Sequence, residues 1–247
     1  MSWYILINLF FLIALVYASV GFGGGSSYLA LLAVVGLSVV VMRPTALLCN
    51  LMVVAGGTWV FFREGQVEWK RIWPLLVSSV PMSYVGATIT FSREDVYFQI
   101  LGFLLMLAAP FLWLQPREQS SVRPLSMVWS FAIGSAIGFV SGLVSIGGGI
   151  FLSPVLYFLS WGRARQISAA ASLFILVNSL SGLAGQWQQV LDLPWRFVAP
   201  LLVVVVAGGQ IGSRLGARKF DPLWIRRITA VLIAVAAVFV LKDHWIF

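Results

Sequence analysis

The sequence has few charged residues and almost none of the side chains that build metal or redox sites. Charged residues make up 10% of its 247 positions, whereas soluble domains carry about 25%. A single cysteine, Cys49, excludes an internal disulfide, and a single histidine, His244, leaves too few ligands for a zinc or haem site. We therefore expect neither a metal ion nor a cofactor.

Acidic residues are also scarce, and all eight fall in expected loops or at helix ends. A proton relay through buried carboxylates is therefore not expected. The sequence has no Gly-x-x-x-x-Gly-Lys-Ser/Thr motif for ATP. A membrane enzyme would need a cluster of His, Asp or Glu at one membrane face, and the sequence offers none. We expect the protein not to be an enzyme.

Hydrophobic residues dominate what is present. They make up 60% of the chain, and the mean hydropathy is +0.98. A soluble fold of this length could not bury that much apolar surface, so the sequence predicts an all-α integral membrane protein. The net charge is +8, but the basic residues lie between or beside apolar runs. They indicate contact with lipid headgroups rather than with nucleic acid.

Apolar runs bounded by charge, proline or glycine predict ten helices separated by short loops. One polar stretch, 115–126, is a candidate cytoplasmic linker between an N-terminal transmembrane repeat, 1–114, and a C-terminal one, 127–247. The expected helices are 3–20, 24–41, 44–62, 72–91, 96–114, 127–144, 148–161, 166–186, 196–213 and 222–241.

Two runs, 1–42 and 124–162, contain no charge and carry a triple glycine near the middle. A helix crosses the bilayer in about 20 residues, so each run is too long for one crossing. We predict that each forms a helical hairpin that turns at Gly23-Gly24-Gly25 or at Gly147-Gly148-Gly149.

The distribution of basic residues supports the hairpins. If each long run returns to its starting side, 12 basic residues lie on one side and 4 on the other, whereas single crossings give 9 and 7. The uneven split predicts a multi-pass protein with both termini extracytoplasmic and the linker cytoplasmic. The four residues on the minority side are Arg43, Arg93, Arg196 and Lys242.

The two halves also match in sequence, in the same order. The triple glycines match at a spacing of 124, Cys49-Asn50-Leu51 matches Ala171-Ser172-Leu173 at 122, and Gly86-Ala87 matches Gly212-Ser213 at 126. We predict two inverted five-helix repeats, an architecture common among secondary transporters. The alternative is that apolar helices resemble one another by composition.

The glycine motifs resemble those of the TauE/SafE family of sulfite and organosulfonate exporters. The first is Gly21-Phe22-Gly23-Gly24-Gly25, followed by Arg43-Pro44-Thr45-Ala46; the second is 141–149, followed by Ser153-Pro154. The resemblance covers nearly the whole chain. It implies export of sulfite, organosulfonates or related sulfur anions across a bacterial cytoplasmic membrane. An anion channel of the same fold is the alternative, and a homodimer stays open.

The glycine turns are the candidate substrate site. A helix that begins at Gly24 or Gly148 presents unpaired N–H groups and a positive dipole end to an anion. The expected binding residues here are Gly23, Gly24, Gly25, Ser26, Ser27, Gly147, Gly148 and Gly149. Because only the first turn carries two serines, we expect the first half to be more sensitive to substitution. The alternative is that the glycines serve only tight turns and helix packing.

Polar side chains within apolar helices are further candidates, because such groups should face the protein interior. Asn50, Ser172, Asn178 and Ser179 are expected to contact substrate, or else to form hydrogen bonds between helices. Cys49 is either an apolar filler or a contact for a sulfur substrate. Arg43 and its match Arg165 either orient the chain or attract anions to the two vestibules.

Overall fold

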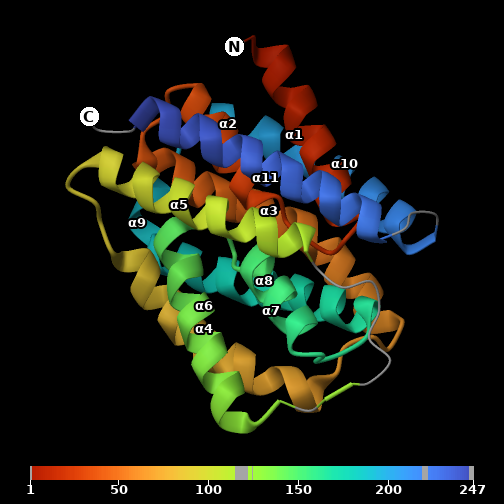
Figure 1. Ribbon diagram of the computed structural model, residues 1–247. Helices are drawn as coiled ribbons and strands as arrows, with labels where there is room; N and C mark the ends of the chain where they lie inside the picture. The colour runs from red at the N-terminus through yellow and green to blue at the C-terminus, as the bar shows by residue number, and fades with distance from the viewer. Residues whose placement is uncertain (1, 115–121, 124, 219–221, 245–247) are drawn as a thin grey trace.

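The chain folds into a helical bundle, seen here in a computed structural model that describes residues 2–114, 122–123, 125–218 and 222–244 (Figure 1). Helices and connecting loops account for all the described residues, as the sequence predicts. Most of the expected linker lies outside them, so the division into two repeats stays a prediction. The helices are α1 Trp3–Ala18, α2 Gly25–Val34, α3 Val39–Arg63, α4 Trp69–Thr88, α5 Glu94–Trp113, α6 Met127–Val144, α7 Gly149–Phe158, α8 Ala164–Gly185, α9 Trp187–Leu191, α10 Trp195–Arg218 and α11 Pro222–His244.

Helix lengths fit a multi-pass membrane protein. Within the described residues, five helices are long and apolar enough to cross a bilayer: α3, α5, α6, α8 and the Trp195–Leu215 part of α10. By contrast, α2 and α7 have ten residues each. At about 1.5 Å per residue they extend about 15 Å, half of the hydrocarbon core. Neither α2 nor α7 can cross the membrane alone.

Both triple glycines break the chain between two helices. Gly24 precedes α2 with φ 89°, and Gly148 precedes α7 with φ 81°. Residues with a Cβ rarely adopt this left-handed conformation, so glycine is required at both positions. The predicted breaks at the triple glycines, between α1 and α2 and between α6 and α7, are present; the return of each hairpin to its starting side stays a prediction.

The helices of the two halves interlock in a repeated pattern. Helix α4 packs along α6, and α10 packs along α1, while α5 lies beside α11 and α3 beside α8. The backbone of Gly86 in α4 touches the carbonyl oxygen of Phe139 in α6 so closely that a Cβ would overlap it. Gly212 in α10 makes the same contact with Leu15 in α1. This matched contact agrees with the two related halves, although their inversion in the membrane stays a prediction.

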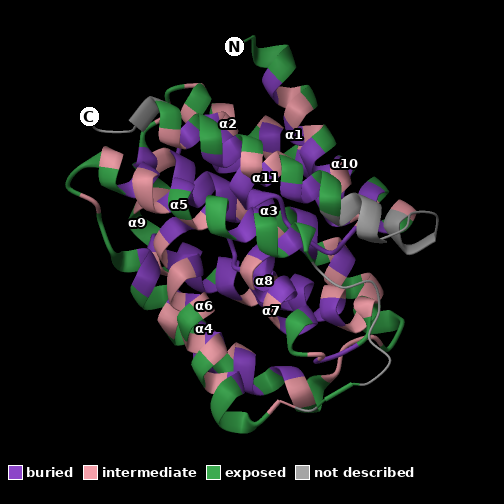
Figure 2. Cartoon of the chain, in the orientation of Figure 1, coloured by how far each residue is buried: buried purple, intermediate pink, exposed green. Residues whose placement is uncertain are grey.

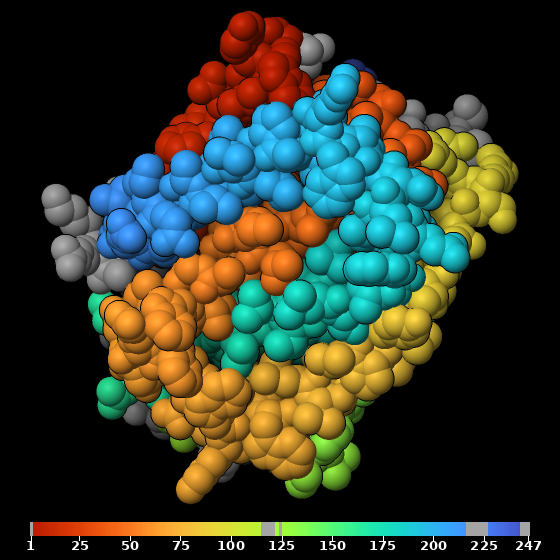
Figure 3. Space-filling model, turned by 180° about the vertical axis from the view of Figure 1, so that it is seen from behind, coloured from red at the N-terminus to blue at the C-terminus, as the bar shows by residue number. Residues whose placement is uncertain are grey.

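The outer surface of the bundle is apolar, as lipid contact requires. Figure 2 shows buried residues along the inner faces of the helices and exposed ones outside. Large exposed side chains on the outside include Phe103, Trp129 and Val203. Figure 3 shows the opposite side of the molecule, where α10, α3 and α8 lie side by side.

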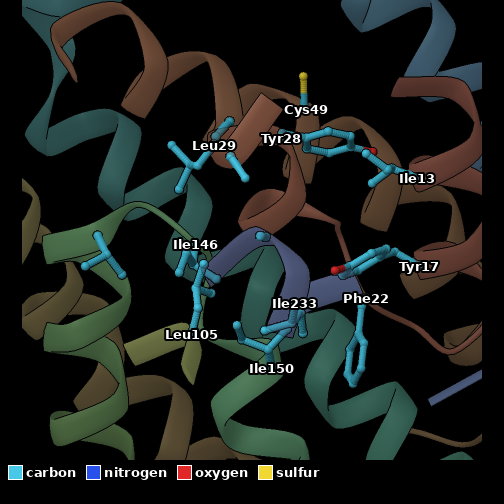
Figure 4. Close-up of a cluster of buried hydrophobic side chains, with 14 of the residues drawn as sticks. Ile13, Tyr17, Phe22, Tyr28, Leu29, Cys49, Leu105, Ile146, Ile150 and Ile233 are labelled. Carbon is cyan, nitrogen blue, oxygen red and sulfur yellow. The ribbon is translucent and has the colours of Figure 1, made fainter. Parts of the chain in front are cut away.

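The two glycine turns share one apolar core. Tyr17, Phe22 and Tyr28 from the first hairpin pack in the same cluster as Ile146 and Ile150 from the second (Figure 4). Because both turns are buried against common neighbours, a change at one turn is felt by the other.

The charge distribution predicts the topology of the termini. A C-terminal reporter that works only in the cytoplasm should be silent after His244, whereas the same reporter inserted at Gln119 should be active. Reporter activity at the C-terminus would contradict the hairpin arrangement.

Candidate functional site

Asn50 in α3 joins the two glycine turns. Its side chain is fully buried; Oδ1 accepts a hydrogen bond from the Gly25 N–H at 2.8 Å, and Nδ2 donates to the Ile146 carbonyl at 2.7 Å. One amide therefore caps α2 and also holds the chain just before Gly147. A Cβ at Gly25 would lie 2.5 Å from Nδ2, and one at Gly23 would overlap Oδ1. These two glycines make room for Asn50.

Replacement of Asn50 by alanine should lower thermal stability. It removes both hydrogen bonds and leaves a buried N–H and a buried carbonyl unpaired, at a cost of about 1–3 kcal/mol for each group. Thermal unfolding in detergent should show the loss. The control is Thr45→Val in the same helix, since the Thr45 hydroxyl donates only to the Val41 carbonyl one turn away. Equal melting temperatures for both variants would show that the bridge adds nothing.

The serines of the first turn are already engaged. The hydroxyls of Ser26 and Ser27 lie 3.3 Å and 2.8 Å from the Tyr17 hydroxyl, and both residues are buried. Asn50 thus caps α2, and Tyr17 engages both serine hydroxyls. In the described part of the chain, the buried Tyr28 hydroxyl beside Gly24 is the first turn's unpartnered side-chain group.

The serines beside the second turn differ from those of the first, because in the described residues their buried hydroxyls have no partner. Ser141 Oγ lies 3.2 Å from the place where a Cβ on Gly148 would stand, and Ser179 Oγ lies 3.2 Å from the corresponding place at Gly147. In the part of the chain that the structure describes, neither hydroxyl forms a hydrogen bond. Both lie beside the glycines that precede α7, whose first N–H groups lack helical acceptors.

The repeat explains why α7 lacks the cap that α2 has. Ser172 matches Asn50, but it is shorter, and its hydroxyl lies 2.9 Å from the Thr58 hydroxyl of α3 instead. Asn178 contacts neither turn through its amide, because Nδ2 donates to Ser79 Oγ and to the Phe174 carbonyl. Its unpartnered atom is Oδ1, an acceptor, which cannot donate to an anion.

Arg43 corrects an expectation from the sequence. Helix α3 begins at Val39 rather than at residue 44, so Arg43 lies inside the helix and is only 2% exposed. It therefore neither faces a vestibule nor acts as an orienting surface charge. Without Arg43, the side of the membrane with fewer basic residues has three of them instead of four. Its match, Arg165, is exposed and lies 3.7 Å from Glu64. The two arginines therefore do not share one role.

The guanidinium of Arg43 reaches the end of α4 and the end of α6. It donates to the carbonyls of Ala87, Ile89 and Gly142 at 3.2, 2.9 and 3.3 Å. Its Nε donates to Ser145 Oγ at 3.1 Å, and Gln186 Nε2 donates to the same oxygen at 2.8 Å. This buried network connects both halves directly beside the second turn.

Cys49 is buried in the apolar cluster around the two turns. Its neighbours in Figure 4 are hydrocarbon and aromatic side chains, including Tyr28. This environment favours the filler role over a contact with substrate.

The sequence is similar to a family of exporters and to proteins that are named probable membrane transporters. A family model described as "Sulfite exporter TauE/SafE" matches residues 6–240. "Probable membrane transporter protein y4hK" of Sinorhizobium fredii (strain NBRC 101917 / NGR234) is 37% identical over 246 residues, 96% of each chain. "Probable membrane transporter protein YjnA" of Bacillus subtilis (strain 168) is 28% identical over 240 residues, 87% of this chain and 91% of the relative. No solved structure matches significantly.

Proposed function

The chain belongs to the sulfite exporter TauE/SafE family of membrane transporters, and we propose that it exports small sulfur-containing anions such as sulfite or organosulfonates. It acts as a secondary transporter in the bacterial cytoplasmic membrane and not as an enzyme. The family assignment confirms the resemblance of the glycine motifs. The substrate and the direction of transport are our proposal.

The observation that carries the proposal is the set of unused donors at the second turn. An anion in the bilayer core needs hydrogen-bond donors, and the start of α7 supplies N–H groups and a positive dipole end. The hydroxyls of Ser141 and Ser179 stand beside it, buried and without a partner. A buried hydroxyl without a partner destabilises the protein. A bound anion would remove this cost by accepting a hydrogen bond, and hydrogen bonds to charged acceptors are stronger than those to neutral ones.

We assign unequal roles to the two turns. At the second turn, Gly147, Gly148, Gly149, Ser179 and Ser141 contact the anion. At the first turn, Asn50 holds the backbone and Tyr17 holds the serine side chains, and this supports the second turn from across the interface. The remaining candidate residues then serve packing between helices: Gly23, Gly24, Gly25, Ser26, Ser27, Ser172 and Asn178.

Uptake into proteoliposomes tests the proposal. Purified protein should take up at least one of sulfite, sulfate, thiosulfate and ethanesulfonate, with saturation and with faster exchange when the same anion is inside. Protein-free liposomes and potassium uptake are the controls. Flux without saturation or counterflow would indicate a channel. No flux of any of the four anions, with and without ion gradients, would overturn the proposed function.

A further inference from the structure

Arg43 is a buried cation without a buried anion. Its four hydrogen-bond acceptors are three carbonyl groups and one hydroxyl, all of them neutral. The rings of Phe91 and Tyr97 lie 5.7 Å and 5.9 Å from the guanidinium carbon. Two ion pairs among the described residues, Arg93 with Asp95 and Arg165 with Glu64, are by contrast largely exposed. In that part of the chain, Arg43 forms no ion pair; the Glu94 carboxylate accepts a hydrogen bond from the Val39 N–H, one turn earlier in α3.

The fold tolerates this charge because two helices end at it. Ala87 and Ile89 lie at the end of α4, and Gly142 lies in the last turn of α6. Carbonyl groups at helix C-termini carry partial negative charge, and they hold the guanidinium in place of a carboxylate. Partial charges do not cancel a full one, so the neighbourhood of Arg43 keeps a net positive charge.

That neighbourhood is the second glycine turn. Gly142 and Ser145 accept hydrogen bonds from Arg43, and they lie within the segment between Ser141 and Gly147. Ser145 adopts a left-handed backbone with φ 59°, at the point where α6 stops and the turn begins. The positive charge is thus held in the same short segment as the proposed anion contacts.

We propose that Arg43 is the specificity-determining charge of the anion site, favouring anions over neutral solutes and dianions over monoanions. It acts mainly through its electric field, since four of its five N–H donors are occupied by carbonyl groups and Ser145. The proposal rests on the anion site at the second turn. For each unit of ligand charge, loss of this field should weaken binding about tenfold, which corresponds to about 1.4 kcal/mol.

A purely structural role is the competing explanation, because Arg43 also ties the ends of α4 and α6 together. The pair Ser145→Asp and Ser145→Asn separates the two roles. Both side chains have the same size, and both tolerate a left-handed backbone. The aspartate places a carboxylate beside Nε and cancels the field, while the contacts of Arg43 with the carbonyl groups stay available. The asparagine leaves the charge uncompensated.

The measurement is inhibition of sulfite uptake by sulfate, a dianion, and by ethanesulfonate, a monoanion. In Ser145→Asp, the inhibition constant for sulfate should rise about 100-fold and that for ethanesulfonate about tenfold, so their ratio rises about tenfold. In Ser145→Asn the ratio should stay within about twofold of the wild-type value. Partial misfolding lowers the maximal rate but leaves this ratio unchanged.

Arg43→Lys and Arg43→Gln, measured in parallel, give a second pair. Lysine should keep the wild-type ratio, because it keeps the charge, and glutamine should raise it as Ser145→Asp does. Equal ratios within both pairs, in a protein that still transports anions, would overturn the inference. A wild-type protein that transports no anion would instead overturn the proposed function on which it rests.

Discussion

Gly138→Leu is expected to abolish the folded protein, whereas Ala136→Leu in the same helix is expected to leave it intact. Gly138 lies on the face of α6 that packs on α4, and a Cβ there would stand 2.5 Å from the Ser79 carbonyl oxygen and 2.6 Å from the Ser79 Cα. These are backbone atoms, which cannot rotate away. Ala136 lies on the exposed face of α6, where a leucine would meet lipid.

The effect should be large because the contact extends along the whole of α6. Gly134, Gly138 and Gly142, four residues apart, each lie against the α4 backbone. A leucine at the central position must force the helices apart, which also breaks the neighbouring contacts. We expect a cost of about 4 kcal/mol or more, close to the total stability of many domains.

Size-exclusion chromatography in detergent, followed by thermal unfolding of any monodisperse fraction, measures this result. Gly138→Ala should give an intermediate loss, because one methyl group requires a smaller separation. If Gly138→Leu eluted and unfolded like Ala136→Leu, the close packing of α4 on α6 would be wrong.

The helices and the turns were predictable because their signals are local. Apolar runs bounded by charge give the long helices, and the triple glycines give the breaks at Gly24 and Gly148. The predicted helix boundaries are less accurate. Pro44 indicates a helix start, since proline is common in the first helical turn. The observed helix begins five residues earlier, at Val39, and includes the proline. The five-residue α9 carries no spanning signal and was missed.

The network around Arg43 was not predictable, because its partners are distant in the sequence. The carbonyls of Ile89 and Gly142 lie 46 and 99 residues away. Nothing near Arg43 in the sequence indicates that two helices end beside it, so the sequence predicts only a charge that orients the chain or attracts anions to a vestibule.

The polarity of Asn50 within an apolar helix identifies it as a candidate, but the repeat pairs it with Ser172, which has different contacts. Alignment of the two halves implies that residues at matched positions have equivalent contacts. The longer amide of Asn50 spans both turns, whereas the Ser172 hydroxyl reaches only Thr58 Oγ1 and, at 3.5 Å, the Val54 carbonyl. The difference in side-chain length lets Asn50 cap α2, whereas Ser172 does not reach the start of α7. This difference between the two halves can be recognised only when the hydrogen-bond partners of Asn50 and Ser172 are known.

The asymmetry also changes which substitutions test the anion site. Alanine at Gly24 or Gly148 would impose a strained left-handed backbone, and at Gly148 its Cβ would lie 2.7 Å from Phe174 Cε1. Loss of transport in either variant could then reflect loss of fold. Serine hydroxyls are better targets, because their removal leaves the backbone unchanged.

The double variant Ser141→Ala/Ser179→Ala should therefore lose anion binding while keeping its stability. Each hydroxyl would donate to the anion, and a hydrogen bond to a charged group contributes about 1.5–3 kcal/mol. We expect the affinity to fall at least tenfold for each hydroxyl. Without ligand, both hydroxyls are buried and unpartnered, so their removal should leave the melting temperature unchanged or raise it.

The matched control is Ser26→Ala/Ser27→Ala at the first turn. Those hydroxyls bond to Tyr17, so their loss should lower the melting temperature while changing affinity little. Thermal-shift titration with sulfite measures both quantities in one experiment. The two double variants should thus change in opposite ways, one in affinity and the other in stability. If Ser141→Ala/Ser179→Ala bound sulfite as the wild type does, the anion would not lie at the start of α7. A larger loss of affinity in the control would instead place it at the first turn, where Ser26 and Ser27 open α2.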